Sequence, residues 1–354
     1  ALDDGIVDLA ALRLSGPQLR ANISGRAGAD TADLTLDARV TDLSPLAEDL
    51  AGPATVSGQV SRDGGPFRLD LSGTGPGGIT LAARGTAAAD GRRVALALDG
   101  TAPLALANAR IAPRTAGGFA RFDLRVDGPP ALSSVSGTIR TEGAQVALPT
   151  LGIGIDAVQL RVDLASGRAR LDGGAILRNG GRLQLSGPVD LAPPFRTDLQ
   201  VALRDGRFTD GSVYDAQADA DLRLAGALAQ GAALSGTVTL GRTELRIPQT
   251  GPGFVILDGL THDGPSPAVQ RTLRYAGFGP RSGAASDDGA AGGAPLDLTI
   301  RAPARVFVRG SGLDAELGGE LALTGTTAEV VPVGRFDLVR GRLDLLGRRL
   351  ALDE

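Results

Sequence analysis

Phe67-Arg-Leu-Asp-Leu-Ser-Gly73 is a short run of alternating apolar and polar residues that ends in glycine. The same phrase recurs as Arg182-Leu-Gln-Leu-Ser-Gly187, Asp221-Leu-Arg-Leu-Ala-Gly226 and Glu320-Leu-Ala-Leu-Thr-Gly325. Successive side chains of a β-strand point to opposite faces, so strict alternation gives each strand one apolar and one polar face. A chain that repeats this phrase along its length is expected to form one long sheet with a continuous apolar face.

Similar runs occur at short intervals between turn dipeptides such as Asp90-Gly91 and Asn179-Gly180. These dipeptides tolerate the positive φ that tight hairpins require. The pattern therefore predicts consecutive antiparallel hairpins. The strands predicted outside the repeated phrase are Leu34–Val40, Ile79–Gly85, Val94–Gly100, Phe119–Gly128, Val158–Leu164, Arg196–Leu203, Leu234–Leu240, Pro295–Arg301, Arg305–Gly310 and Gly334–Arg340.

Two segments interrupt the alternation and predict short helices, Ser44–Gly52 and Ser266–Gly277. Each has proline at the first helical position and glycine past the end, which is the usual asymmetry of helix termini. The second is followed by Gly279–Ala294, a Gly/Ala/Ser/Asp-rich segment without apolar period that predicts a flexible insertion. The expected organisation is a repetitive β-groove segment over 1–260, the helix and insertion over 261–295, and a β segment over 296–354 that continues the same sheet.

The composition fits an all-β core without cofactor chemistry. The 354 residues include 52 glycines, 3% aromatic residues and no Cys, Met or Trp, so there is no disulfide and no thiolate metal site. All 36 basic residues are arginine, against 40 acidic residues. Either a GC-rich genome or selection for bidentate arginine contacts explains this usage. No basic run suggests nucleic acid as a partner.

No apolar run reaches the roughly 18 residues that span a bilayer. The chain begins at Ala1 in mid-pattern, so we expect it to be a fragment.

Motifs for enzymatic chemistry are weak. His262 is the single histidine and lies in a polar turn. Gly73–Gly78 is glycine-rich, but the residues after it read as a strand, whereas a phosphate loop opens into a helix. Asp287 and Asp288 lack further ligands at EF-hand spacing. The sequence therefore predicts a protein that is not an enzyme, with no catalytic residue, metal or cofactor.

The remaining candidate site is the apolar face itself. It is either a core closed by packing on itself or an open trough for a ligand. Apolar surface left in water costs about 25 cal/mol per Å², so an open trough would suit a lipid tail. The predicted groove-lining residues are Leu34, Leu36, Leu69, Leu71, Phe122, Leu124, Leu160, Val162, Leu183, Leu185, Leu199, Val201, Leu222, Leu224, Val306, Val308, Leu321, Leu323, Phe336 and Leu338.

Two C-terminal stretches resemble the C-terminal region of the TamB family. They are Val306-Phe-Val-Arg-Gly-Ser-Gly-Leu-Asp-Ala-Glu-Leu-Gly-Gly319 and Arg340-Gly-Arg-Leu-Asp-Leu-Leu-Gly-Arg-Arg349. The specific part of the likeness covers roughly a quarter of the chain. The helix Ser266–Gly277 fits variants of the family, and the rest matches as generic repeats.

This resemblance implies an elongated, strongly curled antiparallel sheet with a greasy interior, a β-taco-like groove. It also implies a periplasmic location, with the parent protein anchored in the inner membrane as in the AsmA-like group. The implied function is passive shielding of phospholipid acyl chains in transit between the two membranes. The alternative is a chaperone or assembly module for outer-membrane β-barrel proteins, acting with the barrel protein TamA by β-augmentation. The family pattern runs on past the second stretch, so we expect the TamA-docking tail to lie beyond Glu354. A solenoid with stacked asparagines is disfavoured, because asparagine occurs only at Asn22, Asn108 and Asn179.

Overall fold

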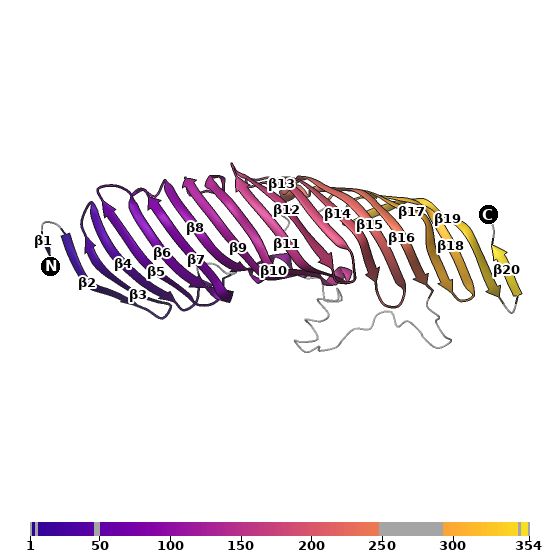
Figure 1. Cartoon of the computed structure of the whole chain (residues 1–354), viewed down its shortest axis with the longest axis horizontal. Coiled ribbons are helices and arrows are strands. Elements are labelled where there is room, and N and C mark those ends of the chain that lie inside the picture. Colours follow the sequence, from indigo (N-terminus) through magenta and orange to yellow (C-terminus); the bar gives the residue numbers. More distant parts are fainter. Residues whose placement is uncertain (1, 4–5, 46–49, 248–292, 346–347, 353–354) are drawn as a thin grey trace. The chain divides into compact units, whose positions relative to one another are not determined.

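The computed structural model describes residues 2–3, 6–45, 50–247, 293–345 and 348–352, and its strands form one all-β sheet (Figure 1). The predicted fold class, an antiparallel sheet with little helix, is confirmed. The strands are β1 (Leu2–Asp3), β2 (Ile6–Ser15), β3 (Leu19–Ala27), β4 (Thr31–Val40), β5 (Ala54–Asp63), β6 (Phe67–Gly75), β7 (Ile79–Ala87), β8 (Val94–Pro103), β9 (Thr115–Gly128), β10 (Val135–Leu148), β11 (Ile153–Ala165), β12 (Arg168–Leu177), β13 (Arg182–Asp190), β14 (Arg196–Thr209), β15 (Tyr214–Ala227), β16 (Ala233–Arg246), β17 (Leu296–Gly310), β18 (Leu313–Gly325), β19 (Val330–Leu345) and β20 (Arg348–Leu352).

The chain divides into two compact units, an N-terminal unit and a C-terminal unit. The N-terminal unit comprises Ala1–Val146, Ala157–Gly173 and Pro188–Ala192. The C-terminal unit comprises Ala147–Asp156, Gly174–Gly187 and Pro193–Glu354. The sequence-based division at residues 261 and 296 stays a prediction.

The helical elements lie between strands and are short. The α-helix α1 covers Asn108–Ile111 and was not predicted. The predicted helix Ser266–Gly277, together with His262 and Asp287-Asp288, lies outside the described residues, as does most of the insertion Gly279–Ala294. The predicted helix Ser44–Gly52 also falls partly outside them. The 3-10 turns are η1 (Pro76–Gly78), η2 (Leu104–Ala107), η3 (Leu132–Ser134), η4 (Pro149–Leu151) and η5 (Leu228–Gln230).

In the N-terminal unit, neighbouring strands pair antiparallel in unbroken register from β3 to β9. Glycines on the apolar face permit close backbone approach. Gly58 has φ of 150°, and a Cβ there would lie 2.0 Å from the carbonyl oxygen of Asp70. Only glycine adopts this mirror-image extended conformation without strain, so we infer that glycines such as Gly58 are points at which a strand can bend.

In the C-terminal unit, every strand pair from β14 to β19 contains a register shift. The shifts lie opposite one another on successive strands, for example between Leu203 and Gly206 on β14 and between Ala216 and Ala218 on β15. A bulge inserts a residue on one strand, bends it and increases its twist. The aligned bulges therefore bend these longer strands at a common level.

The seam between β16 and β17 departs from the predicted run of antiparallel hairpins. These two strands pair parallel, with Leu234 opposite Leu296 and Leu245 opposite Val308. A hairpin turn cannot join parallel strands, which need a longer crossover connection. Alternation of side chains does not reveal strand direction, so the sequence prediction of a continuous meander is wrong at this pair.

Candidate functional site

The predicted groove-lining residues of the N-terminal unit lie in continuous cross-strand rows. Residues paired directly across a sheet share a face, so each row extends the apolar face by one strand at a time. One row contains Ile23, Leu36, Gly58, Leu71, Ala83, Leu98 and Leu124, and the next contains Gly25, Leu34, Val60, Leu69, Gly85, Leu96 and Val126. Phe122 pairs with Gly100 in a third row. Leu160 and Val162 alternate with exposed Gln159 and Arg161 on β11.

The C-terminal unit has equivalent rows despite its bulges. One row contains Val201, Leu222, Gly236, Leu298, Leu323 and Pro332, and another contains Leu199, Leu224, Leu234 and Leu296. Beyond the bulges, Val306 and Leu338 both pair with Leu317, while Val308 pairs with Leu245 and Ala315. Leu321 pairs with Ile300 and Gly334, and Phe336 pairs with Gly319. Leu183 and Leu185 occupy alternate positions of β13.

Most of the apolar face is only half covered. All twenty predicted lining residues are half-buried except Val306, which is 5% exposed. Among the described residues, no large side chain is fully buried, and more than half of the buried apolar residues are alanines. A self-packed core would bury its leucines and phenylalanines almost completely.

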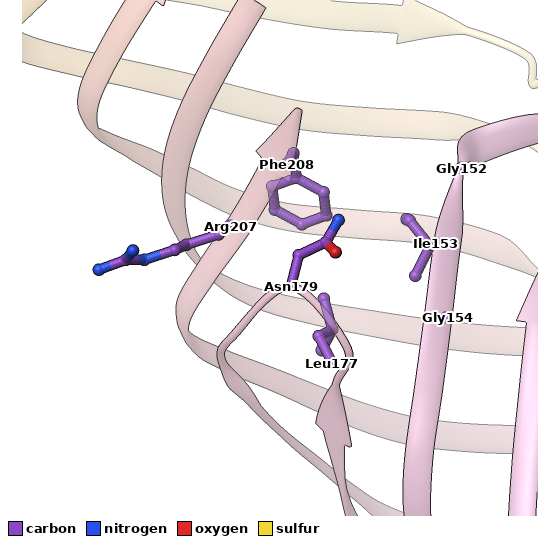
Figure 2. A pocket seen from close by; sticks show the side chains of 7 residues that line it. All are labelled: Gly152, Ile153, Gly154, Leu177, Asn179, Arg207 and Phe208. Atoms are coloured by element: carbon purple, nitrogen blue, oxygen red, sulfur yellow. The ribbon is translucent and has the colours of Figure 1, made fainter. Parts of the chain in front are cut away.

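One part of the C-terminal unit does pack on itself. Leu177, Leu203 and Ala220 are buried together, and Ile153 and Phe208 pack against them, as do Leu183, Leu222 and Val238. Figure 2 shows Phe208, Ile153, Leu177 and Asn179 converging, while Arg207 points away. The hollow that remains has a volume of about 10 Å³, enough for about one water molecule. At this point the face is closed to a hydrocarbon chain.

The opposite face of each unit is polar and held by cross-strand pairs. In the N-terminal unit, the hydroxyls of Thr55 and Thr74 lie 2.7 Å apart, and Arg84 binds Asp70 at 3.1 Å. In the C-terminal unit, Arg223 donates to both carboxylate oxygens of Asp198 at 2.6 and 2.7 Å. This hydrogen bonding lowers the pKa of Asp198. The polar face is therefore well solvated. Such cross-strand polar pairs do not characterise the apolar face.

The sequence analysis did not single out a group of arginines on the polar face of β16–β20. We call it the arginine rim, and it consists of Arg242, Arg246, Arg309, Arg340, Arg342 and Arg349. The signal available in the sequence was arginine alternating with other residues in Arg340-Gly-Arg-Leu-Asp344 and Arg242-Thr-Glu-Leu-Arg246. Only the register brings these segments together.

Other site types receive no support within the described residues. They contain no group of three or more side chains that could hold a metal ion. They also contain no helix long and apolar enough to cross a bilayer. The glycine-rich segment Gly73–Gly78 passes through the 3-10 turn η1 into strand β7, as its sequence predicts.

Comparison with known proteins identifies the family. A family model described as the TamB C-terminal domain matches residues 172–354, just over half of the chain. Searches of curated proteins and of solved structures return no match. The predicted TamB resemblance is confirmed, and it extends well upstream of the two stretches that suggested it. The chain therefore belongs to the TamB family, whose members are cell-envelope proteins of the translocation and assembly module.

Proposed function

We propose that the protein is a periplasmic, non-enzymatic groove that holds phospholipid acyl chains against the apolar face of its sheet. The parent protein would be anchored in the inner membrane, and lipid would pass between the two membranes of the envelope. The apolar tails would lie along the rows of leucine and valine. The head groups would stay in water at the ends of the strands.

The observation that carries this proposal is the half-covered apolar face. In the N-terminal unit, two uninterrupted apolar and glycine rows cross seven strands, and their leucines are half-buried. Such a face is unfavourable in water and gains from any apolar cover. Each methylene of a lipid tail transferred onto it contributes about 0.8 kcal/mol. The same hydrophobic gain operates at each row outside the packed cluster around Leu177 and Leu203, so movement along the open rows needs no chemical step.

Photo-crosslinking tests this proposal on the two faces of the same strands. Benzoylphenylalanine would replace Leu36 or Leu323 on the apolar face, and Thr35 or Ala322 on the polar face as matched controls. The chain would be expressed in a Gram-negative periplasm, and captured molecules would be identified by mass spectrometry. We expect phospholipid adducts at Leu36 and Leu323 only. Equal adducts on both faces, or none at either apolar position, would refute the proposal.

The second candidate function is β-augmentation of outer-membrane barrel strands, in partnership with a TamA-like barrel protein. It is favoured by the edge of β19. Strand β20 pairs only with Gly341–Leu345, so Val330–Arg340 has one hydrogen-bonded neighbour, β18, among the described strands. Val331 and Val333 on this edge are 46% and 60% exposed. An apolar edge strand is a template for an added strand.

Lysine substitutions distinguish this second function from the first. Val331→Lys with Val333→Lys should abolish crosslinks between β19 and an unfolded barrel protein, because edge lysines oppose strand addition. The same change at Thr324 and Ala322, on the paired strand β18, serves as the control. Lipid adducts at Leu36 should persist in all these variants. Barrel-protein crosslinks that survive the edge lysines would rule the second function out.

A further inference from the structure

The two ends of strands β16–β19 differ in charge. At the end where β16 and β17 finish, the arginine rim faces four carboxylates of β16–β20, Glu244, Asp314, Glu316 and Asp344, and a fifth, Asp215 of β15, lies opposite Glu244. At the opposite end, where these two strands begin, the described charged residues are Asp297 and Glu329. The rim therefore carries an excess of positive charge in a chain whose formal net charge is −4. This asymmetry favours an anion at one end only.

Two of the four carboxylates of β16–β20 at this end, Glu244 and Asp314, are each shared among several arginines. Glu244 accepts from Arg242 at 2.7 Å and lies 3.4 Å from Arg309 and 3.9 Å from Arg246. Asp314 lies 3.1 Å from both Arg309 and Arg342. A guanidinium has five N–H donors. Glu244 and Asp314 together contact four arginines, which carry more N–H donors than these two carboxylates can accept.

An aromatic ring fixes the guanidinium groups at the centre of the rim. Phe307 is an aromatic residue among the polar side chains on this face of β17. The guanidinium carbons of Arg309 and Arg242 lie 5.0 and 5.5 Å from its ring centroid. These are cation–π distances. Beside the ring is a hollow of about 300 Å³, lined by Phe307, Arg309, Asp314, Glu316, Arg340, Gly341 and Arg342. Oriented guanidinium groups around a hollow suit bidentate recognition of phosphate.

The apolar face reaches the same end of the strands. Leu245 and Leu350 are 37% and 48% exposed. Leu350 continues the row of Leu313 and Leu343, and Leu245 lies in the row next to it. Leu245 lies one position from Glu244 and Arg246, so apolar and cationic side chains meet across the thickness of a single strand. An amphiphile with an anionic head and apolar tails matches this arrangement.

We propose that the arginine rim binds the phosphate of a phospholipid whose acyl chains lie on the apolar face at the same end of β16–β20. The inference rests on the proposed function and adds a head-group site to it. The rim holds the anionic head group outside, while the tails contact Leu245, Leu313 and Leu350. Entry or exit of lipid is thereby assigned to this end of the C-terminal unit.

Short-chain lipids below their micelle concentration test the head-group site on the full chain. The probes are dihexanoyl phosphatidic acid, dihexanoylglycerol, which has the same tails without phosphate, and inorganic phosphate. The variant Arg246→Gln with Arg342→Gln removes two charges, yet leaves Glu244 paired with Arg242 and Asp314 paired with Arg309. The control Arg301→Gln with Arg335→Gln removes two charges from the same polar face in mid-strand. Binding is measured by equilibrium dialysis, and folding by circular dichroism.

We expect the rim variant to weaken phosphatidic acid binding about tenfold, as for loss of charge-assisted hydrogen bonds. Binding of dihexanoylglycerol should not change, and the control should bind like the wild type. The variant Arg246→Lys with Arg342→Lys should keep part of the affinity, because lysine retains the charge without the bidentate geometry.

Three results would overturn the inference. If the rim variant binds phosphatidic acid as tightly as the control, the rim is not the head-group site, while unchanged tail binding leaves the groove proposal standing. If inorganic phosphate binds as tightly as the lipid, the rim is a site for free anions. If neither lipid binds the wild type, the groove proposal itself fails, and the head-group assignment fails with it.

Discussion

The N-terminal and C-terminal units build the same kind of sheet but differ in how regularly their strands pair. From β3 to β8, strands of nine or ten residues pair without a register shift, and glycines such as Gly58 lie at positive φ against the next strand. From β14 to β19, strands of 13 to 16 residues carry a bulge in every pair. Gly236 and Gly334 of the C-terminal unit approach a neighbouring carbonyl oxygen at positive φ just as Gly58 does, so the bulges there add to the glycines and do not replace them. A register shift also occurs between the short strands β2 and β3, so strand length alone does not decide where a bulge forms.

The largest expected effect is a side chain placed at a bending glycine of the N-terminal unit. Gly58→Val would put Cβ against the carbonyl oxygen of Asp70 in a backbone conformation that valine cannot adopt. We expect a loss of about 3 kcal/mol or more in the free energy of unfolding, measured by urea denaturation. Gly91→Ala, a turn position with nothing within 4 Å, is the control and should lose much less. A loss below about 1 kcal/mol at Gly58 would show that glycine does not set the bend.

The next largest effect is a difference in the free energy of unfolding between substitutions in the closed and in the open part of the apolar face. Leu203→Ala removes a side chain that is 9% exposed within the packed cluster of the C-terminal unit. It should cost about 2–4 kcal/mol. Leu36→Ala removes a half-buried side chain of the N-terminal unit and should cost about 1 kcal/mol, because little cavity forms. Equal losses by thermal denaturation would mean that the N-terminal face is packed as tightly as the cluster.

A smaller effect is expected at a bulge. Arg305 has φ of 84° between the two halves of β17, a conformation that favours glycine. Arg305→Gly should therefore change the free energy of unfolding by no more than about 1 kcal/mol, in either direction. A large loss of stability for Gly58→Val together with a small change for Arg305→Gly would sharpen the distinction between a glycine position and a bulge position. A loss for Arg305→Gly as large as that for Gly58→Val would contradict this distinction.

The smallest effect concerns acid stability of the exposed ion pairs. The hydrogen bond from Arg223 lowers the pKa of Asp198 in the folded protein below its ordinary value of 3.8. A lowered folded-state pKa contributes stability above the ordinary value, and this contribution is lost as the pH falls through the folded-state pKa. Arg223→Gln should raise the Asp198 pKa toward 3.8 in an NMR titration and flatten the stability curve in that range. An unchanged Asp198 titration would contradict the assignment.

Alternation made most of the strands predictable, and the two C-terminal stretches Val306–Gly319 and Arg340–Arg349 made the family recognisable. Every strand predicted from the sequence lies in or overlaps an observed strand, although Pro295–Arg301 and Arg305–Gly310 are two parts of β17. The missed strands include β5, where Ser57, Gly58 and Gln59 interrupt the apolar positions, and β2, where a register shift breaks the period between Leu9 and Leu12.

The arrangement of the site was harder to predict from the sequence than the strands were. The lining residues were chosen by period alone, and the register places those of β4, β6, β9 and β14–β19 in apolar rows. Period does not tell an open face from a packed one, so the cluster around Leu177 and Leu203 was not foreseen. The arginine rim depends on which strands are neighbours. Arg246 and Arg309 become adjacent only through the parallel pairing of β16 with β17.

The parallel seam also has a consequence for how the chain assembles. Every other strand pair between β14 and β20 joins strands that are only a few residues apart in the chain, whereas β17 pairs with residues about sixty positions earlier. Contacts of such high sequence separation form slowly, because the intervening chain must first be closed into a loop. The hairpins of β17–β20 can form before that closure. We therefore expect the C-terminal unit to fold as two blocks. Until β17 pairs with it, β16 has an unpaired edge that is open to pairing with another chain.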